Sequence, residues 1–160
     1  MFIIKIIKYL LQAIIIYLFF IIVKVIGLSL GRKLFSYLFN KIGPSVRSDR
    51  TVDSNLEKFL GFQKKDIKKN IKSKMWANYG KIFVEYLFLK KFKNTHIHME
   101  IKGEEILNKI KKNNKPVIFV SGHFANFELM SMELTKRDIN LATIYRPLNN
   151  IFLNPFMEYL

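Results

Sequence analysis

The segment VIFVSGHFANFELM, residues 117–130, carries side chains that suit acid–base chemistry. His123 follows an apolar run, and Glu128 lies five residues further on. A carboxylate that holds an imidazole fixes its tautomer and stabilises the imidazolium that forms during proton transfer. The chain has no cysteine, and no serine stands in a nucleophile-elbow motif. The pattern therefore predicts direct attack, in which His123 deprotonates an acceptor hydroxyl whose oxygen attacks an acyl thioester. Main-chain N–H groups at the start of the next helix would stabilise the oxyanion.

The spacing of this pair requires a turn. On one continuous helix His123 and Glu128 would point about 140° apart. They meet only if His123 lies in a loop, and Gly122 with residues 124–126 allows the chain to turn there. A His-x4-Glu spacing also arises by chance, and a histidine near a strand end is often structural. The catalytic interpretation of the pair therefore depends on the elements that surround it.

Strand-like and helix-like patterns alternate around the pair. Strands are predicted at HIHMEIKG (96–103), PVIFVSG (116–122) and LATIY (141–145), with helices at 104–112 and 124–135. This order predicts an α/β sheet with right-handed crossovers. His123 would then follow the carboxyl end of a buried strand, where such sheets bind ligands.

The N-terminal segment, residues 2–30, is apolar apart from a few side chains. A membrane span needs about 20 apolar residues, and Lys5, Lys8 and Lys24 can extend to the interface. Two interpretations stay open: a tilted transmembrane helix, or a hydrophobic helix within one leaflet. No small-x-small cleavage site follows the apolar run, which favours an uncleaved anchor over a signal peptide. Basic residues between Arg32 and Arg50 predict that this flank is cytoplasmic.

The formal net charge is +15, which predicts a polyanionic partner. Much of this charge lies on a predicted amphipathic helix whose opposite face is aromatic. Its basic face carries Lys64, Lys65, Lys68, Lys69, Lys72 and Lys74, opposed locally only by Asp66. This face would attract anionic lipid headgroups or an acidic protein, or it is an ordinary solvated face. The aromatic residues have core-facing spacing and no nucleic-acid fold is recognisable, so nucleic acid is not predicted as a partner.

His96 and His98 would share one face of a strand, a spacing that metals can use. No third ligand is evident near them. The pair is interpreted as an exposed edge-strand pair, and no metal site is predicted.

The block SGHFANFE, residues 121–128, resembles the Gly-His-Phe-Gly-Asn-Trp-Glu block of the bacterial lipid A biosynthesis acyltransferases, the lauroyl and myristoyl transferases. Further blocks resemble the family in the same order: GRKLF (31–35), RTVDSNLEKFLG (50–61), MWANYGKIFVEYL (75–87) and YRPLNN (145–150). Ala125 stands where the family usually has Gly, and Phe127 where it usually has Trp. Family members are nearly twice this length, so the chain is expected to be a C-terminally truncated fragment.

The resemblance implies roles for individual residues. His123 would be the catalytic base, and Glu128 its partner. Arg146 would contact phosphate or shape the site, and Tyr145 belongs to the same block. Asn126 would bind substrate or orient the loop, or else cap the following helix.

The resemblance also implies the reaction. A fatty acyl chain would pass from acyl carrier protein to a hydroxyl of a lipid A precursor, at the cytoplasmic face of the bacterial inner membrane. No cofactor is needed, because the thioester supplies the activated acyl group. Another glycolipid or lysophospholipid acceptor remains an alternative, as does an inactive membrane-associated remnant.

These inferences predict an α/β chain in two parts. Residues 1–40 would form a membrane-anchor or interfacial helix. Residues 41–160 would form the incomplete N-terminal part of an acyltransferase domain, with helices and a partial glycerolipid-acyltransferase-like mixed sheet.

Overall fold

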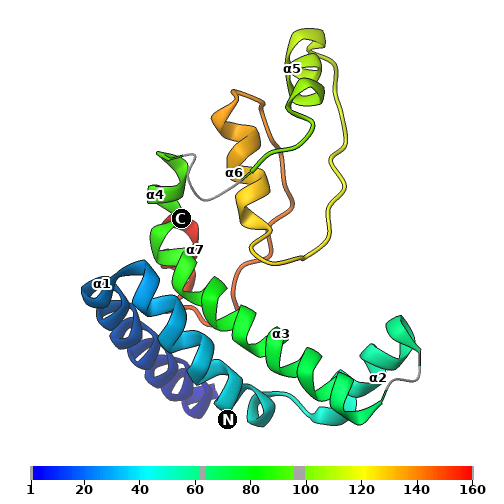
Figure 1. Ribbon diagram of the computed structural model, residues 1–160. Helices are drawn as coiled ribbons and strands as arrows, with labels where there is room; N and C mark the ends of the chain where they lie inside the picture. The colour runs from blue at the N-terminus through cyan, green and yellow to red at the C-terminus, as the bar shows by residue number, and fades with distance from the viewer. Residues whose placement is uncertain (1, 62–63, 96–99, 160) are drawn as a thin grey trace. The chain divides into compact units, whose positions relative to one another are not determined.

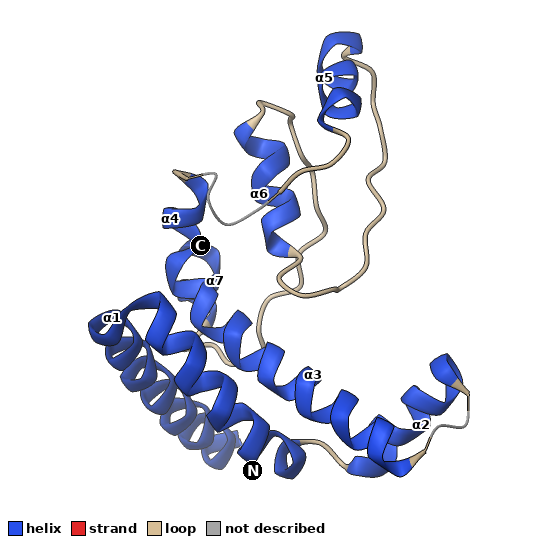
Figure 2. Cartoon of the chain, in the orientation of Figure 1, coloured by secondary structure: helices blue, strands red, loops and turns tan. Residues whose placement is uncertain are grey.

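The computed structural model describes residues 2–61, 64–95 and 100–159, and every regular element in these ranges is a helix (Figures 1 and 2). The helices are α1 (Phe2–Val46), α2 (Asp49–Leu60), α3 (Lys65–Glu85), the 3-10 turn η1 (Tyr86–Phe88), α4 (Leu89–Lys93), α5 (Glu104–Asn113), α6 (Glu128–Lys136) and α7 (Asn154–Tyr159). The chain divides into two compact units. The first contains Met1–Leu18 and Phe88–Leu160, and the second contains Phe19–Leu87.

The long helix α1 is two helices joined at Gly27. Gly27 has φ 80° and ψ 175°, a region of backbone conformation that is essentially restricted to glycine. Within the second unit, the rings of Phe19 and Phe35 lie 5.5 Å apart edge to face, whereas a straight helix would separate these residues by about 24 Å. Residues 28–35 therefore fold back along residues 19–26 (Figure 1).

The core of the second unit is an aromatic cluster between α1 and α3. Phe35 stacks on Phe83 with ring centroids 5.3 Å apart. Phe20 and Phe39 also contact Phe83, at 5.1 and 5.5 Å. A Cβ placed on Gly80 would lie 2.1 Å from the carbonyl oxygen of Phe35. The lack of a side chain at Gly80 therefore lets the backbones of α1 and α3 approach closely.

The predicted α/β sheet is absent from the described residues, and that prediction was wrong. Residues 116–122 and 141–145 run as loops. Of the predicted strand at 96–103, residues 96–99 lie outside the described residues, and the remainder is not a strand. A buried parallel strand needs hydrogen-bonded neighbours and cover on both faces. Neither is present here, since Ile118 and Val120 are 92% and 91% exposed.

The helices predicted beside those segments are confirmed in part. The helix predicted at 104–112 is present as α5. The helix predicted at 124–135 is present as α6, but it begins at Glu128, because the chain turns between residues 122 and 127.

Among the described residues, α1 is the one helix long and apolar enough to cross a membrane. Its side chains before Gly27 include a large exposed apolar set. Length and composition alone are weak evidence for a span, because signal sequences and buried core helices share them.

Candidate active site

His123 lies in the loop that precedes α6. The Phe124 amide donates a hydrogen bond to the Gly122 carbonyl oxygen at 2.8 Å, and Ala125 has a positive φ of 46°. The chain therefore turns between His123 and α6, as the spacing requires. The His123 side chain is exposed, and its ring centroid lies 4.1 Å from that of Phe127.

Glu128 is the first residue of α6 and is half-buried. Both partners of the predicted pair are described, and no hydrogen bond or ion pair joins His123 to Glu128. His123 contacts the Phe127 ring instead. A carboxylate in the first turn also interacts favourably with the positive end of its own helix, which is a purely structural role for Glu128. The catalytic roles of this pair stay predictions.

Asn126 is the most buried residue of the loop, with 9% of its surface exposed. Its carbonyl oxygen accepts a hydrogen bond from the Leu129 amide at 3.2 Å. The helix α6 starts after Phe127 without a side-chain cap. The role of Asn126 in substrate binding stays a prediction.

Tyr145 and Arg146 lie on a loop that Asn154 organises. The Tyr145 hydroxyl donates a hydrogen bond to Asn154 Oδ1 at 3.2 Å, and the Leu148 amide donates to the same oxygen at 2.9 Å. The Arg146 side chain is exposed. Sequence reasoning missed Asn154, although Pro155 after it is a signal for a helix start.

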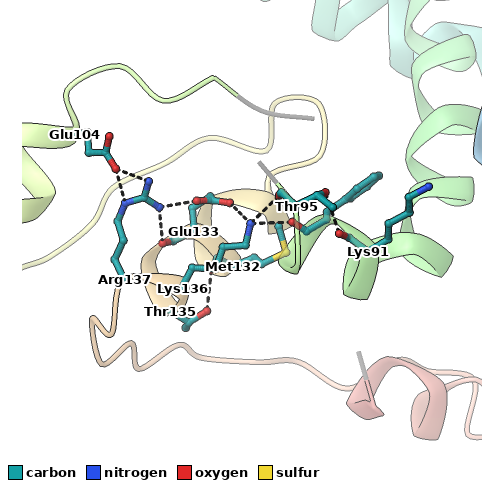
Figure 3. A network of polar contacts seen from close by, with 9 residues as sticks. Lys91, Thr95, Glu104, Met132, Glu133, Thr135, Lys136 and Arg137 are labelled. Atoms are coloured by element: carbon teal, nitrogen blue, oxygen red, sulfur yellow. Dashed lines mark hydrogen bonds and ion pairs between the residues drawn. The ribbon is translucent and has the colours of Figure 1, made fainter. Parts of the chain in front are cut away.

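A buried ionic network holds α6 in the first unit (Figure 3). Lys136 Nζ donates to Glu133 Oε1 at 2.6 Å and to the carbonyl oxygens of Phe92 and Thr95 at 2.7 and 3.2 Å. The side chains of Lys136 and Glu133 are 8% and 7% exposed. Lys136 therefore ties α6 to the C-terminal end of α4.

Arg137 extends the same network to α5. It donates to Glu133 Oε2 at 2.5 Å and to Glu104 Oε1 at 2.8 Å. Burial raises the pKa of Glu133, but hydrogen bonds and positive charge from Lys136 and Arg137 outweigh burial and leave this pKa below its usual value. Hydrogen bonds to Glu104 and Glu133 raise the pKa of Arg137. The spacing of Glu133, Lys136 and Arg137 was a signal for this network that sequence reasoning did not use.

The lysine-rich face of α3 is partly neutralised by α2. Lys68 pairs with Glu57, and Lys72 Nζ lies 3.1 Å from Asp53 Oδ1. A groove between α1, α2 and α3 is lined by Asn40, Pro44, Asp53, Lys65, Lys68, Lys69, Lys72, Ser73 and Trp76. The groove thus combines four ammonium groups with one carboxylate and an indole ring.

In the part of the chain that the structure describes, no three His, Cys, Asp or Glu side chains gather where they could hold a metal ion. The predicted pair His96 and His98 lies outside the described residues. Its assignment to an edge strand stays a prediction.

The family model for bacterial lipid A biosynthesis acyltransferases matches residues 4–159, and the chain belongs to this family. The resemblance seen in the sequence blocks is thereby confirmed, and acyl transfer of the lipid A type is the activity of the family. Comparison with curated proteins and with solved structures gives no match.

Proposed function

We propose that this protein transfers a fatty acyl chain from acyl carrier protein to a hydroxyl of a lipid A precursor. The observation that carries the proposal is membership of the lipid A acyltransferase family over residues 4–159. The exposed His123 imidazole supports it, because a general base must reach an acceptor that arrives from outside the protein.

In the proposed reaction, His123 removes the proton from the acceptor hydroxyl. The oxygen then attacks the thioester carbonyl, and the tetrahedral intermediate collapses with cleavage of the carbon–sulfur bond. The imidazolium returns its proton to the departing thiolate, so the products are an ester and a free thiol. Glu128 would stabilise the imidazolium after a side-chain movement that brings the two together.

Three further residues are proposed to bind substrate. Arg146, with its exposed guanidinium, would pair with a phosphate of the lipid A precursor. Tyr145 would be held for this purpose by its hydrogen bond to Asn154. Asn126, buried in the loop beside His123, would orient the acceptor.

The basic groove of the second unit is proposed to recruit anionic partners. Its lysines would attract the acidic acyl carrier protein and anionic membrane lipids. Lys68 and Lys72 pair with carboxylates of α2. Lys65 and Lys69 are therefore the groove lysines best placed to attract these anionic partners.

The proposed location is the cytoplasmic face of the bacterial inner membrane. The apolar helix at residues 2–26 supports membrane attachment. The basic residues between Arg32 and Arg50 support the cytoplasmic side.

The reaction is tested with the purified chain in mixed micelles, acyl carrier protein bearing a radiolabelled acyl group, and a lipid A precursor. We expect label to appear in the precursor. Label that appears instead in a different glycolipid or in a lysophospholipid would favour the related acyltransferase. If no acceptor takes label, the chain acts as a membrane-associated protein without transfer activity.

A further inference from the structure

Two of the four lysines that line the basic groove of the second unit are committed to α2. Lys68 pairs with Glu57, and Lys72 Nζ lies 3.1 Å from Asp53 Oδ1. The side chains of Lys68 and Lys72 are only 17% and 19% exposed. These two lysines therefore hold α2 against α3, and carboxylates of the protein itself balance their charge.

The other two groove lysines, Lys65 and Lys69, are exposed and form no ion pair with any residue that the structure describes. They stand four residues apart on α3, where side chains are neighbours on one face of a helix, and like charges at this spacing destabilise the helix. The carboxylate next along the helix, Asp66, does not line the groove. The groove therefore keeps two neighbouring positive charges that no described side chain balances.

The same groove contains a fixed indole ring and neutral polar groups. A Cβ placed on Gly43 would lie 2.1 Å from Cδ2 of Trp76, so the indole lies against the backbone of α1. The side chains of Asn40, Ser73 and Trp76 line the groove and form no hydrogen bond with any described residue. The groove volume is about 820 Å³, within the range of about 300–1,000 Å³ that is typical of small-molecule sites. The groove therefore has the size and the available donors of a site for a small polar anion.

We propose that this groove binds a phosphate monoester, with the ammonium groups of Lys65 and Lys69 on its phosphate oxygens. A phosphate monoester carries about −1.5 to −2 charges near neutral pH, which matches the two unbalanced lysines, whereas a phosphate diester carries a single negative charge. Hydrogen bonds from ammonium groups to phosphate are charge-assisted and therefore strong. Asn40 and Ser73 meet the polar alcohol portion of the ligand. The inference rests on the proposed recruitment of anions by this groove, but not on acyl transfer.

Two sources supply a phosphate monoester: the headgroup of a phosphorylated lipid and a soluble phosphorylated compound. Trp76 is the only tryptophan of the chain, so its fluorescence reports occupation of the groove. The full chain is titrated in neutral detergent micelles with glycerol phosphate, and in phosphatidylethanolamine vesicles that contain increasing fractions of phosphatidic acid. The matched diester probes are glycerophosphoglycerol in micelles and phosphatidylglycerol in vesicles.

We expect a saturable change in Trp76 emission with a monoester in at least one arm, and the arm that responds identifies the source. Lys65→Met and Lys69→Met should each weaken this binding by roughly 10- to 100-fold, because each removes a charge-assisted contact. Both lysines are exposed, so these variants should fold normally. Lys74→Met is the matched control and should retain the affinity, since Lys74 is an exposed lysine of α3 outside the groove.

Equal affinity for the matched diesters would overturn the proposal, because a single negative charge would then be sufficient. Unchanged affinity in Lys65→Met and Lys69→Met would overturn it as well. A response of Trp76 to acyl carrier protein, without a response to either monoester, would instead make the groove a docking site for an acidic protein. Acyl transfer is not measured in this titration, so an inactive chain leaves the test intact, and an active chain that ignores both monoesters contradicts the groove assignment alone.

Discussion

The ammonium of Lys136 on α6 lies 2.7 Å from the carbonyl oxygen of Phe92 on α4. The last carbonyl groups of a helix have no partner within that helix. Lys136 supplies one, and it neutralises Glu133 at the same time. The helix α6, which follows the His123 loop, is thereby fixed to α4.

Replacement of Lys136 by Met should lower the free energy of unfolding by about 1.5–3 kcal/mol, the usual contribution of hydrogen bonds to a charged group. The loss stays below that of a fully broken buried pair because Arg137 still contacts Glu133. Urea denaturation followed by circular dichroism measures it. Lys111→Met is the matched control, since Lys111 pairs with Asp138 at the exposed surface, and such pairs contribute about 0–1 kcal/mol. Equal losses in the two variants would contradict the assigned role.

The lowered pKa of Glu133 predicts a decrease of stability in acid. The contribution of this group is fully present above its ordinary pKa of 4.5 and is lost as pH falls through the lower pKa of the folded state. The raised pKa of Arg137 leaves its contribution constant over this range. Denaturation at a series of pH values below 5 should therefore show a smaller loss of stability in Glu133→Gln than in the unmodified chain. Parallel curves for the two proteins would count against the network.

Ala125→Gly should stabilise the His123 loop. A left-handed conformation costs an ordinary residue about 1–2 kcal/mol, and glycine removes this cost. Glycine also loses more conformational entropy on folding, which offsets roughly 0.5–1 kcal/mol of the stabilisation. We expect a net increase of about 0.5–1 kcal/mol in thermal or urea denaturation. Asn114→Gly is the control, because Asn114 has the same φ of 46° and asparagine tolerates it better. A gain at Asn114 that exceeds the gain at Ala125 would rule out this explanation.

The sequence predicts local structure here better than it predicts pairing between segments. Helical periodicity was sufficient to predict α5. The apolar runs around Val120 and Ile144 have strand propensity, but a strand also needs neighbours, and the described residues provide none. The close approach of Gly80 to Phe35 joins residues distant in sequence, and the reversal at Gly27 was not revealed by any local pattern.

The candidate site shows the same division between local and long-range information. The turn after His123 could be predicted because Gly122 and the required spacing are local. The contact of His123 with Phe127, the hydrogen bond of Tyr145 to Asn154 and the Lys136 contacts depend on how the loops fold and on residues distant in sequence. The family blocks predict which residues matter, and packing determines what they touch.

Catalysis by His123 is the central claim, and the rate of labelled acyl transfer to the lipid A precursor tests it most directly. We expect His123→Ala to reduce this rate by roughly 10²- to 10⁴-fold, the usual contribution of a general base, with an unchanged circular dichroism spectrum. His96→Ala controls for the loss of a histidine and should retain the rate. If His123→Ala transfers acyl groups at a rate close to that of the unmodified chain, His123 is not the base.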